Sequence, residues 1–516
     1  MQDSDVIVIG SGIGGLTAAA LLARYGRQVI VCESHTIAGG AAHSFRRRGF
    51  EFDSGPSFYC GLTHVQSLNP IKQVLNVLDE SLETLPYEPL GYYHFPEGVF
   101  PVYSNVLAYR QQVAKITPQG ARELEKFEES LLPLYEAMKG IPILGLRADW
   151  QLIPMLLKGY LPSLWKILPY FPMIQGSVGN VMDATVQDPW VRRLIDLECF
   201  LLSGLKAHGT ITPEIAFMLG ERSQLGVEYP LGGSGAIVNA LVRGLKRWGG
   251  KLRLGCHVEQ ILVEKLHLTS VNKVVGVRLQ NGEILKAPVV ISNASIWDTY
   301  TQLLHPDDLP FSFRQAALNT SAIHSFMHLH LGIKASGLDN LAGHHVVVHD
   351  QTKDITTPGN TCMISIPSVW DATLAPSGHH VVHAYTLEPY AGWERNNEYE
   401  QNKRKKVQTL YYALERIIPD IRERVVLELI GTPLTHAHYL RRYQGTYGPA
   451  IAAGKGTFPG PHTPIQGLYR VGDSTMPGIG VPAVAASGIL CANTLVKPAA
   501  IRKSLQNTSG GQENQE

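Results

Sequence analysis

The sequence predicts an α/β fold, α+β overall, in which a parallel-sheet domain is interrupted by a second domain of helices and an antiparallel sheet. Three observations predict it. A strand–helix–strand pattern begins the chain, and a strand-to-helix pattern lies near its end. Both are rich in glycine, and much of the sequence between them lacks this glycine-rich α/β pattern. The chain has 516 residues, of which 44% are hydrophobic, so it can bury a large core and is expected to form two domains.

The opening pattern lies in the first strand, the helix after it and the strand that follows. Residues 5–9 are a short apolar, β-branched run, as expected of a buried parallel strand. Residues 16–25 are rich in Ala and Leu and predict a helix that ends at Gly26, and residues 28–32 predict a second strand. Together they predict a βαβ unit.

The glycines of this unit indicate a dinucleotide site. Gly10 permits the tight turn, Gly12 lets the backbone approach a pyrophosphate, and Gly15 lets the helix lie against the strand. The positive end of the helix favours phosphate charge. Glu33 lies about twenty residues downstream, where a carboxylate accepts hydrogen bonds from ribose hydroxyls. The residues expected to contact the dinucleotide here are Gly10, Gly12, Ile13, Gly14, Gly15, Glu33 and Ser34.

The segment after Glu33 indicates which dinucleotide is bound. Gly39-Gly40-Ala41 follows the acid at a spacing that resembles flavoproteins of the glutathione-reductase-like class. In that class an extra loop covers the phosphates of FAD, and a nicotinamide enzyme has no need of it. The resemblance implies a glutathione-reductase-like, FAD-binding Rossmann domain, with Gly39, Gly40 and Ala41 at the cofactor.

Four later stretches are expected to complete the cofactor site. The turn after the strand 50–52 would present the backbone of Gly55 and Pro56 to the flavin ring. Val258 begins a strand that could hold adenine, and Asn293 ends the buried strand 289–294. Near the C-terminus, the strand 467–471 leads into a glycine-rich helix start that is receptive to anions, and a positive helix end there stabilises negative charge on a reduced flavin. The residues expected to bind FAD in this last block are Gly472, Asp473, Gly480, Val481, Pro482 and Ala483.

These patterns divide the chain into alternating segments. Residues 1–60, 225–298 and 431–500 are assigned to the FAD-binding domain. Residues 61–224 are expected to form a helical insertion, and residues 299–430 a substrate domain with an antiparallel sheet. The polar tail 501–516 is expected to be disordered.

The segment 150–174 is the most unusual part of the insertion. Its four prolines exclude one long helix, and its Trp, Tyr and Lys residues are the types that settle at a bilayer interface. We weigh two interpretations. The segment is either a helical lid on the protein's own core, or a surface for membrane contact and a mouth for an apolar substrate.

Composition excludes several other functions. The formal net charge of +1 gives no electrostatic argument for nucleic acid. The six cysteines are scattered and are interpreted as reduced thiols.

The N-terminus enters its first strand at once, and no apolar run reaches 18 residues. We therefore expect no signal peptide and no transmembrane helix, but a protein on the cytoplasmic side of a membrane with peripheral contact.

Histidines and tyrosines supply the candidates for further chemistry. His328 and His330 share one face of an alternating, half-buried strand, but no convergent ligand set is evident, so no metal is expected. His436, Tyr443 and Tyr447 precede the C-terminal cofactor block. They are candidates for acid–base catalysis or for cation stabilisation, and ordinary wall residues are the alternative.

Both ends of the chain resemble one family. Val-Ile-Val-Ile-Gly-Ser-Gly-Ile-Gly-Gly-Leu and Tyr-Arg-Val-Gly-Asp-Ser-Thr-x-Pro-Gly-Ile-Gly-Val-Pro-Ala are similar to the carotenoid desaturases, carotenoid isomerases and retinol saturases, as are Phe-Asp-Ser-Gly-Pro and Tyr-Pro-Leu-Gly-Gly-Ser-Gly between them. Within this family the chain resembles the isomerase-like and C-3',4' desaturase-like members of oxygenic phototrophs. The resemblance implies a membrane-dissolved carotenoid substrate.

The resemblance leaves the reaction open. We expect desaturation of an acyclic carotenoid by hydride transfer to flavin N5, with quinone or oxygen as the electron acceptor. Redox-neutral cis–trans isomerisation of poly-cis carotenes, or polyene saturation, is the alternative. From other classes, an amine oxidase or a non-catalytic flavin- or carotenoid-binding protein remains open.

Overall fold

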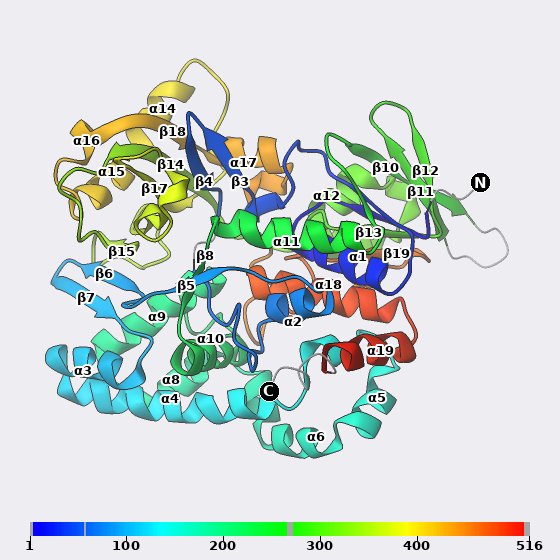
Figure 1. Ribbon diagram of the computed structural model, residues 1–516, viewed down its shortest axis with the longest axis horizontal. Helices are drawn as coiled ribbons and strands as arrows, with labels where there is room; N and C mark the ends of the chain where they lie inside the picture. Colours follow the sequence, from blue (N-terminus) through cyan, green and yellow to red (C-terminus); the bar gives the residue numbers. More distant parts are fainter. Residues whose placement is uncertain (1–3, 56–57, 266–271, 510–516) are drawn as a thin grey trace.

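The computed structural model describes residues 4–55, 58–265 and 272–509 (Figure 1). Pro56, predicted at the cofactor, lies outside these residues. Figure 1 shows the nucleotide-binding elements around α1 and α18 beside a second sheet that includes β14 and β17, with a layer of helices below. The mixed α/β fold with a Rossmann-type domain is the predicted fold class.

A parallel five-stranded sheet forms the centre of the first domain. Its order is β19 (Leu468–Arg470), β13 (Val289–Ser292), β1 (Val6–Ile9), β2 (Val29–Cys32) and β9 (Lys251–Arg253). The apolar runs predicted these strands because both faces are covered, and every residue of β1 and β2 is buried. Segments from the two ends of the chain therefore meet through β13.

Three helices cover this sheet. They are α1 (Ile13–Arg24), α11 (Gly233–Arg247) and α18 (Val481–Thr494). The small residues of α1 and α18 allow a close crossing: a Cβ on Gly488 would lie 2.6 Å from the Gly14 carbonyl oxygen. A three-stranded meander of β10 (Val258–Lys265), β11 (Asn272–Leu279) and β12 (Ile284–Lys286) is attached. Asn281-Gly282, a dipeptide typical of tight hairpin turns, lies between its last two strands.

The second sheet has seven strands. Its order is β18 (Val425–Gly431), β14 (Ser325–Lys334), β17 (His379–Glu388), β16 (Thr361–Ser365), β15 (His344–Val348), β6 (Gly91–Phe95) and β7 (Gly98–Val102). The prediction of a half-buried β14 is wrong, because the helix α15 (Gln408–Glu415) covers one face and buried histidines fill the other.

The insertion 61–224 was predicted to be helical, but it also contains strands. Its strands β6 and β7 extend the second sheet, where β6 pairs in parallel with β15 far along the chain. Its helices α3 (Val106–Ile116), α4 (Pro118–Met138), α8 (Val178–Thr185), α9 (Pro189–Ser203) and α10 (Thr212–Leu225) share one apolar core with these strands. The insertion and the sheet therefore form one packed unit.

The segment 150–174 folds into short helices, as its prolines require. They are α5 (Leu152–Gly159), α6 (Leu161–Ile167) and α7 (Phe171–Ile174). None of their residues is buried, and large apolar side chains are exposed on all of them. The described part of the chain contains no helix with the length and apolar character needed to cross a bilayer.

The prediction of a disordered tail from residue 501 is wrong for its first part. The helix α19 runs over Pro498–Ser509, and Ile501 is buried in the core that surrounds α1 and α2 (Pro70–Val77). Pro498 favours a helix start, and this apolar contact holds the helix on the domain. Residues 510–516 lie outside those described.

Candidate active site

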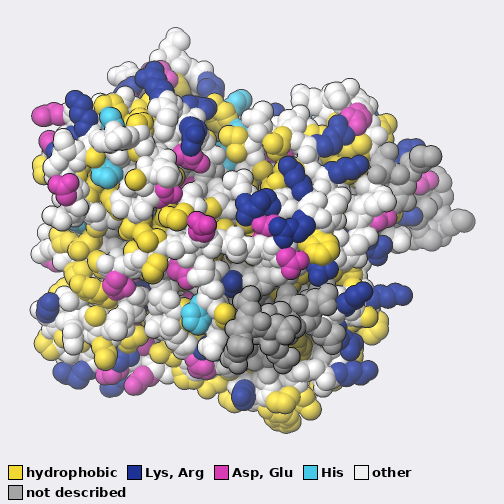
Figure 2. Space-filling view, viewed as in Figure 1, with side chains coloured by type: hydrophobic (Ala, Val, Ile, Leu, Met, Phe, Trp, Pro, Cys, Tyr) yellow, Lys and Arg dark blue, Asp and Glu magenta, His cyan; other side chains and the backbone are white. Residues whose placement is uncertain are grey.

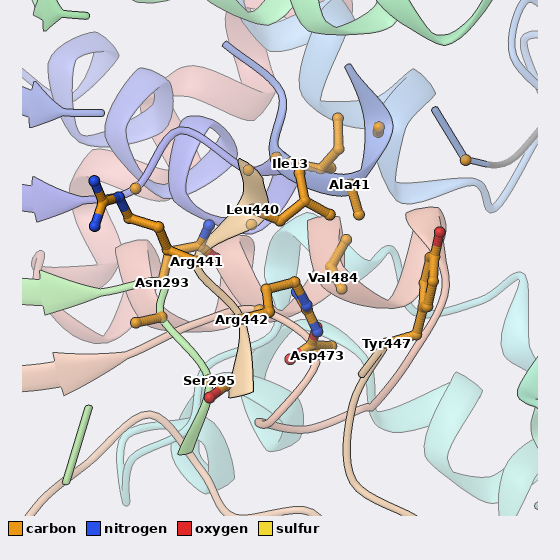
Figure 3. A pocket seen from close by; sticks show the side chains of 18 of the residues that line it. Ile13, Ala41, Asn293, Ser295, Leu440, Arg441, Arg442, Tyr447, Asp473 and Val484 are labelled. Carbon is orange, nitrogen blue, oxygen red and sulfur yellow. The ribbon is translucent and has the colours of Figure 1, made fainter. Parts of the chain in front are cut away.

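A cavity of about 830 Å³ lies between the nucleotide-binding domain and the second sheet. Figure 3 shows Ile13 and Ala41 at the top of the view, Asn293 and Ser295 on the left, Tyr447 on the right, and Val484 and Asp473 between them. At one end the lining consists of polar side chains and of the glycine backbone of the loops that meet there. At the other end the wall is apolar, with Phe200, Leu201, Leu202, Ile323, Phe326, Met363 and Ile479.

The N-terminus of α1 faces the cavity with its backbone amides. Gly12 is its N-cap residue, and no side chain of the described residues caps the helix there. A Cβ on Gly15 would lie 2.3 Å from the Gly10 carbonyl oxygen, which confirms that this glycine is needed for close helix–strand packing. The free amides and the helix dipole make this end receptive to phosphate.

A second helix N-terminus approaches the first. Gly480, with φ of 105°, precedes α18, which also has no side-chain cap among the described residues. A Cβ on Gly14 would lie 3.0 Å from Gly472 Cα, and Asn293 is wedged against both glycines. The two glycine-rich motifs from opposite ends of the chain therefore form one binding site. Because glycines have no side chains, a ligand can approach the backbone there.

Glu33 is held in place where a ribose is expected. Its carboxylate accepts hydrogen bonds of 2.7 Å from both the backbone N–H and the hydroxyl of Ser11. It also accepts one of 2.8 Å from the backbone N–H of His35. Val258, which we expected to hold adenine, begins β10 and lines the same cavity as Glu33.

Most of the predicted cofactor residues line the cavity. They are Gly10, Gly12, Ile13, Gly14, Glu33, Ser34, Gly39, Gly40, Ala41, Gly55, Val258, Asn293, Gly472, Asp473, Gly480 and Val481. Gly15 supports the packing behind them. Pro482 and Ala483 lie in the first turn of α18 but do not line the cavity, because Val484 takes that place one turn along the helix.

Sequence reasoning missed the arginines that follow α17 (Pro433–Leu440). Arg441 and Arg442 both line the cavity, and Arg442 forms a close ion pair with Asp473. Asp473, which we expected to bind the phosphate or ribityl region of FAD, is thus already paired with a cation of the protein. The doubled arginine in the sequence was the only signal.

The three catalytic candidates are not equivalent. Tyr447 lines the cavity beside Tyr385, and burial raises the pKa of both hydroxyls, that of Tyr385 to about 12. His436 lies one layer behind, with its ring 5.3 Å from that of Tyr447. Tyr443 is stacked on Trp297, with ring centroids 4.9 Å apart, and does not line the cavity. Of the three, only Tyr447 is placed to touch a ligand.

Behind Tyr447, four histidines form a buried column. His328 stacks on His436 with ring centroids 4.4 Å apart, and His330 stacks on His383 at 4.2 Å. Burial lowers their pKa values, that of His330 to about 4 and that of His436 to about 3, so the rings are neutral at pH 7. His328 Nδ1 and His383 Nε2 share a hydrogen bond of 2.9 Å.

Our expectation that no histidines converge here is wrong, because His383 lies opposite His330 in the paired strand. The geometry nevertheless disfavours a shared metal. The rings of His330 and His383 are within 6° of parallel and face one another, whereas a metal lies near the plane of each ligand ring, about 2.0–2.1 Å from its nitrogen. One ion cannot satisfy both planes.

The fold and the site define a flavin-dependent oxidoreductase: a Rossmann-type βαβ unit, a diglycine loop and a C-terminal helix enclose one dinucleotide-sized cavity. The chain belongs to the family of flavin-containing amine oxidoreductases, which it matches over residues 13–496. The predicted cofactor, FAD, and the predicted enzyme class are confirmed.

Similar proteins fall in the predicted family as well. The chain is 34% identical to the chloroplastic prolycopene isomerase 1 of an Oncidium hybrid cultivar, over 97% of this chain and 85% of that protein. It is 28% identical to the neurosporene-forming phytoene desaturase of Cereibacter sphaeroides, over 94% and 93%. Among solved structures, an oxidoreductase from Methanosarcina mazei matches with a TM-score of 0.60 at 21% identity, over 94% and 98%.

Proposed function

We propose that this chain is an FAD-dependent enzyme of carotenoid biosynthesis that acts on an acyclic, membrane-dissolved polyene. The observation that carries the proposal is the division of the cavity into a glycine-lined nucleotide end and an apolar end. Phe200, Phe326 and Met363 at the apolar end suit a hydrocarbon chain, because burying it gains roughly 0.8 kcal/mol for each methylene-sized unit.

Two reactions fit such a site. In desaturation, the substrate loses a hydride and a proton, and FAD when bound supplies the hydride acceptor; quinone or oxygen would then take the electrons. In redox-neutral isomerisation, the substrate keeps its composition and changes only its geometry. Isomerisation is the second candidate. It is supported by the greater identity of the chain to the prolycopene isomerase than to the phytoene desaturase.

Tyr447 and the apolar wall have distinct roles in either reaction. The wall excludes water and orients the polyene. The Tyr447 hydroxyl stays protonated because burial raises its pKa, so it can donate a hydrogen bond or hold a proton but does not act as a phenolate base. The neutral His436 ring behind it supports the orientation of the Tyr447 ring.

We further propose that the protein contacts a membrane peripherally through the α5–α7 face, which comprises the exposed side chains of residues 150–171. Trp150 is 75% exposed and Trp165 is 67% exposed, beside the exposed Lys158 and Lys166. Figure 2 shows hydrophobic side chains at the lower edge of the molecule, where Figure 1 places α6. Indole rings beside lysines suit the boundary between lipid tails and headgroups.

Expression in a bacterium that makes lycopene or its poly-cis precursors tests the function. Loss of two hydrogens from the pigment indicates desaturation, unchanged mass with altered geometry indicates isomerisation, and gain of hydrogen indicates saturation. The purified protein should be yellow from bound FAD. If no precursor changes while an amine is oxidised with release of hydrogen peroxide, the carotenoid proposal fails and an amine oxidase replaces it. Pigment that is bound without being converted indicates a carrier.

A further inference from the structure

The charges that line the cavity are poorly matched to a diphosphate. The described lining contains the acids Glu33, Glu259, Asp298 and Asp473. A diphosphate adds further negative charge to this set, and the α1 N-terminus offsets about half an elementary charge. Arg441 and Arg442 are the only Lys or Arg residues in the lining, as far as the chain is described.

The side chain of Arg442 already binds other groups of the protein. Its guanidinium pairs with Asp473 and donates a hydrogen bond of 2.6 Å to the Thr446 carbonyl oxygen. Burial acts to lower the pKa of Arg442, but the charges of Asp473 and Asp298 act the other way, and the pKa is raised overall. Figure 3 shows Arg442 pointing toward Asp473, whereas Arg441 extends away from it on the side of Asn293. The charge of Arg442 therefore balances protein carboxylates rather than a ligand.

Arg441 differs from Arg442 in its contacts. Its side chain is exposed and makes no hydrogen bond or ion pair within the described residues. Its positive charge is close enough to His257, the neighbour of Val258, to help lower the pKa of that ring. Among the described residues, a cation with no hydrogen-bond or ion-pair partner thus lies at the nucleotide end of the cavity, on the side of Asn293 and His257.

The backbone of Arg441 adds a second indication. It ends α17 with φ of 46° and ψ of 47°, a left-handed conformation that glycine or asparagine adopts with less strain. Nothing in the helix ending itself calls for an arginine. Backbone strain at a ligand-facing position is typical of residues whose side chain has a functional task.

We propose that Arg441 binds the diphosphate of FAD, together with the N-terminus of α1. The left-handed turn after α17 directs its guanidinium along the nucleotide end of the cavity, where the planar group can donate paired hydrogen bonds to phosphate oxygens. Arg442 is a positioning residue that neutralises Asp473. The inference rests on the FAD site alone and is independent of which substrate the enzyme converts.

Cofactor affinity tests the inference. The full-length protein is depleted of flavin, and binding of FAD is followed by quenching of flavin fluorescence, with ADP and adenosine as competitors. Arg441→Gln should raise the Kd for FAD and for ADP about tenfold or more, because a hydrogen bond to a charged group is lost. The Kd for adenosine should not change. The difference from wild type should shrink at about 1 M salt.

Three further variants keep the test decisive. Arg441→Lys should retain part of the affinity, and Arg441→Gly, which relieves the backbone strain, should bind FAD as weakly as Arg441→Gln. Arg27→Gln removes an exposed arginine outside the cavity and should leave the Kd unchanged. Wild-type affinity for FAD in Arg441→Gln or Arg441→Gly would overturn the inference, as would equal weakening of adenosine. Failure of the wild type to bind FAD would instead overturn the cofactor assignment.

Discussion

Tyr447 presents its side chain to the cavity from the loop after α17, beside Phe326 of β14. Their rings meet edge to face with centroids 4.8 Å apart, so the phenol is held by packing on one side and by His436 on the other. A hydroxyl fixed in this way can serve as a proton donor without moving.

Replacement of Tyr447 by Phe removes only this hydroxyl. We expect Tyr447→Phe to lower turnover of the carotenoid about tenfold or more while the FAD content stays at the wild-type level. Tyr412→Phe, which changes an exposed tyrosine on α15, is the matched control and should have no effect. Full activity in Tyr447→Phe would show that the residue only shapes the wall. Turnover is measured per bound flavin, so that loss of cofactor is not mistaken for loss of chemistry.

The histidine column predicts acid sensitivity. Burial lowers the pKa of His383 well below 6.5, so the unfolded chain takes up a proton that the folded chain does not. The contribution of His383 to stability is therefore complete above pH 6.5 and is lost as the pH falls below 6.5, by at most about 1.4 kcal/mol per pH unit.

Urea unfolding at pH 7 and pH 5 measures this contribution. The fall in unfolding free energy between the two pH values should be smaller in His383→Gln than in the wild type. His324→Gln, at an exposed histidine just before β14, should keep the wild-type pH dependence. An unchanged pH dependence in His383→Gln would mean that the folded and unfolded proteins protonate this ring to the same extent.

At the scale of elements, the crossing of α1 and α18 holds the site together. Because glycine stands at residue 488, the two helices approach closely and their N-termini open onto the same cavity. A bulky side chain at this position would separate the helices and with them the two halves of this binding site.

Gly488→Val tests the crossing. Its side chain would meet the Gly14 carbonyl and Thr17, so we expect a loss of about 1–3 kcal/mol in unfolding free energy and weaker FAD retention. Gly159→Val changes a helical glycine that has open space around it and should do neither. Thermal unfolding and flavin absorbance after gel filtration report both quantities. A Gly488→Val protein with wild-type stability would contradict the close crossing.

The predictability of each element from sequence depends on how local its determinants are. β1, α1 and α18 could be predicted because apolar runs, small residues and glycines within one short stretch specify them. The place of β6 in the second sheet could not, since β15, its partner, lies far along the chain. His383 at the histidine column and Arg441 at the cavity were missed for the same reason: only tertiary packing brings them there.

At the scale of the whole molecule, the α5–α7 face and the cavity together suit an enzyme that draws its substrate from a membrane. Insertion of a large apolar side chain into lipid gains about 1.5–3 kcal/mol, and several such side chains are exposed on this face. The sum is sufficient for reversible attachment without a spanning helix.

Vesicle flotation tests the attachment. The double variant Trp165→Glu and Leu168→Glu should largely abolish binding to phospholipid vesicles, because it places charge in the apolar part of the face. Phe311→Glu, at a side chain that is 78% exposed on α13 (Phe311–Leu318), should bind like the wild type. If both proteins float equally, the face is a lid and another surface contacts the membrane. Activity on detergent-dispersed substrate should survive in both variants.

The order of strands β19, β13 and β1 in the central sheet has a consequence for biosynthesis. A chain emerging from the ribosome makes β1 and α1 long before it makes β19 and α18. The flavin pocket therefore closes only after β19 and α18 have been made, and the cofactor, by binding the closed form alone, stabilises the contact of these elements with β1 and α1. In riboflavin-starved cells, finished chains would lack this stabilisation, and a protease would release the C-terminal segment first.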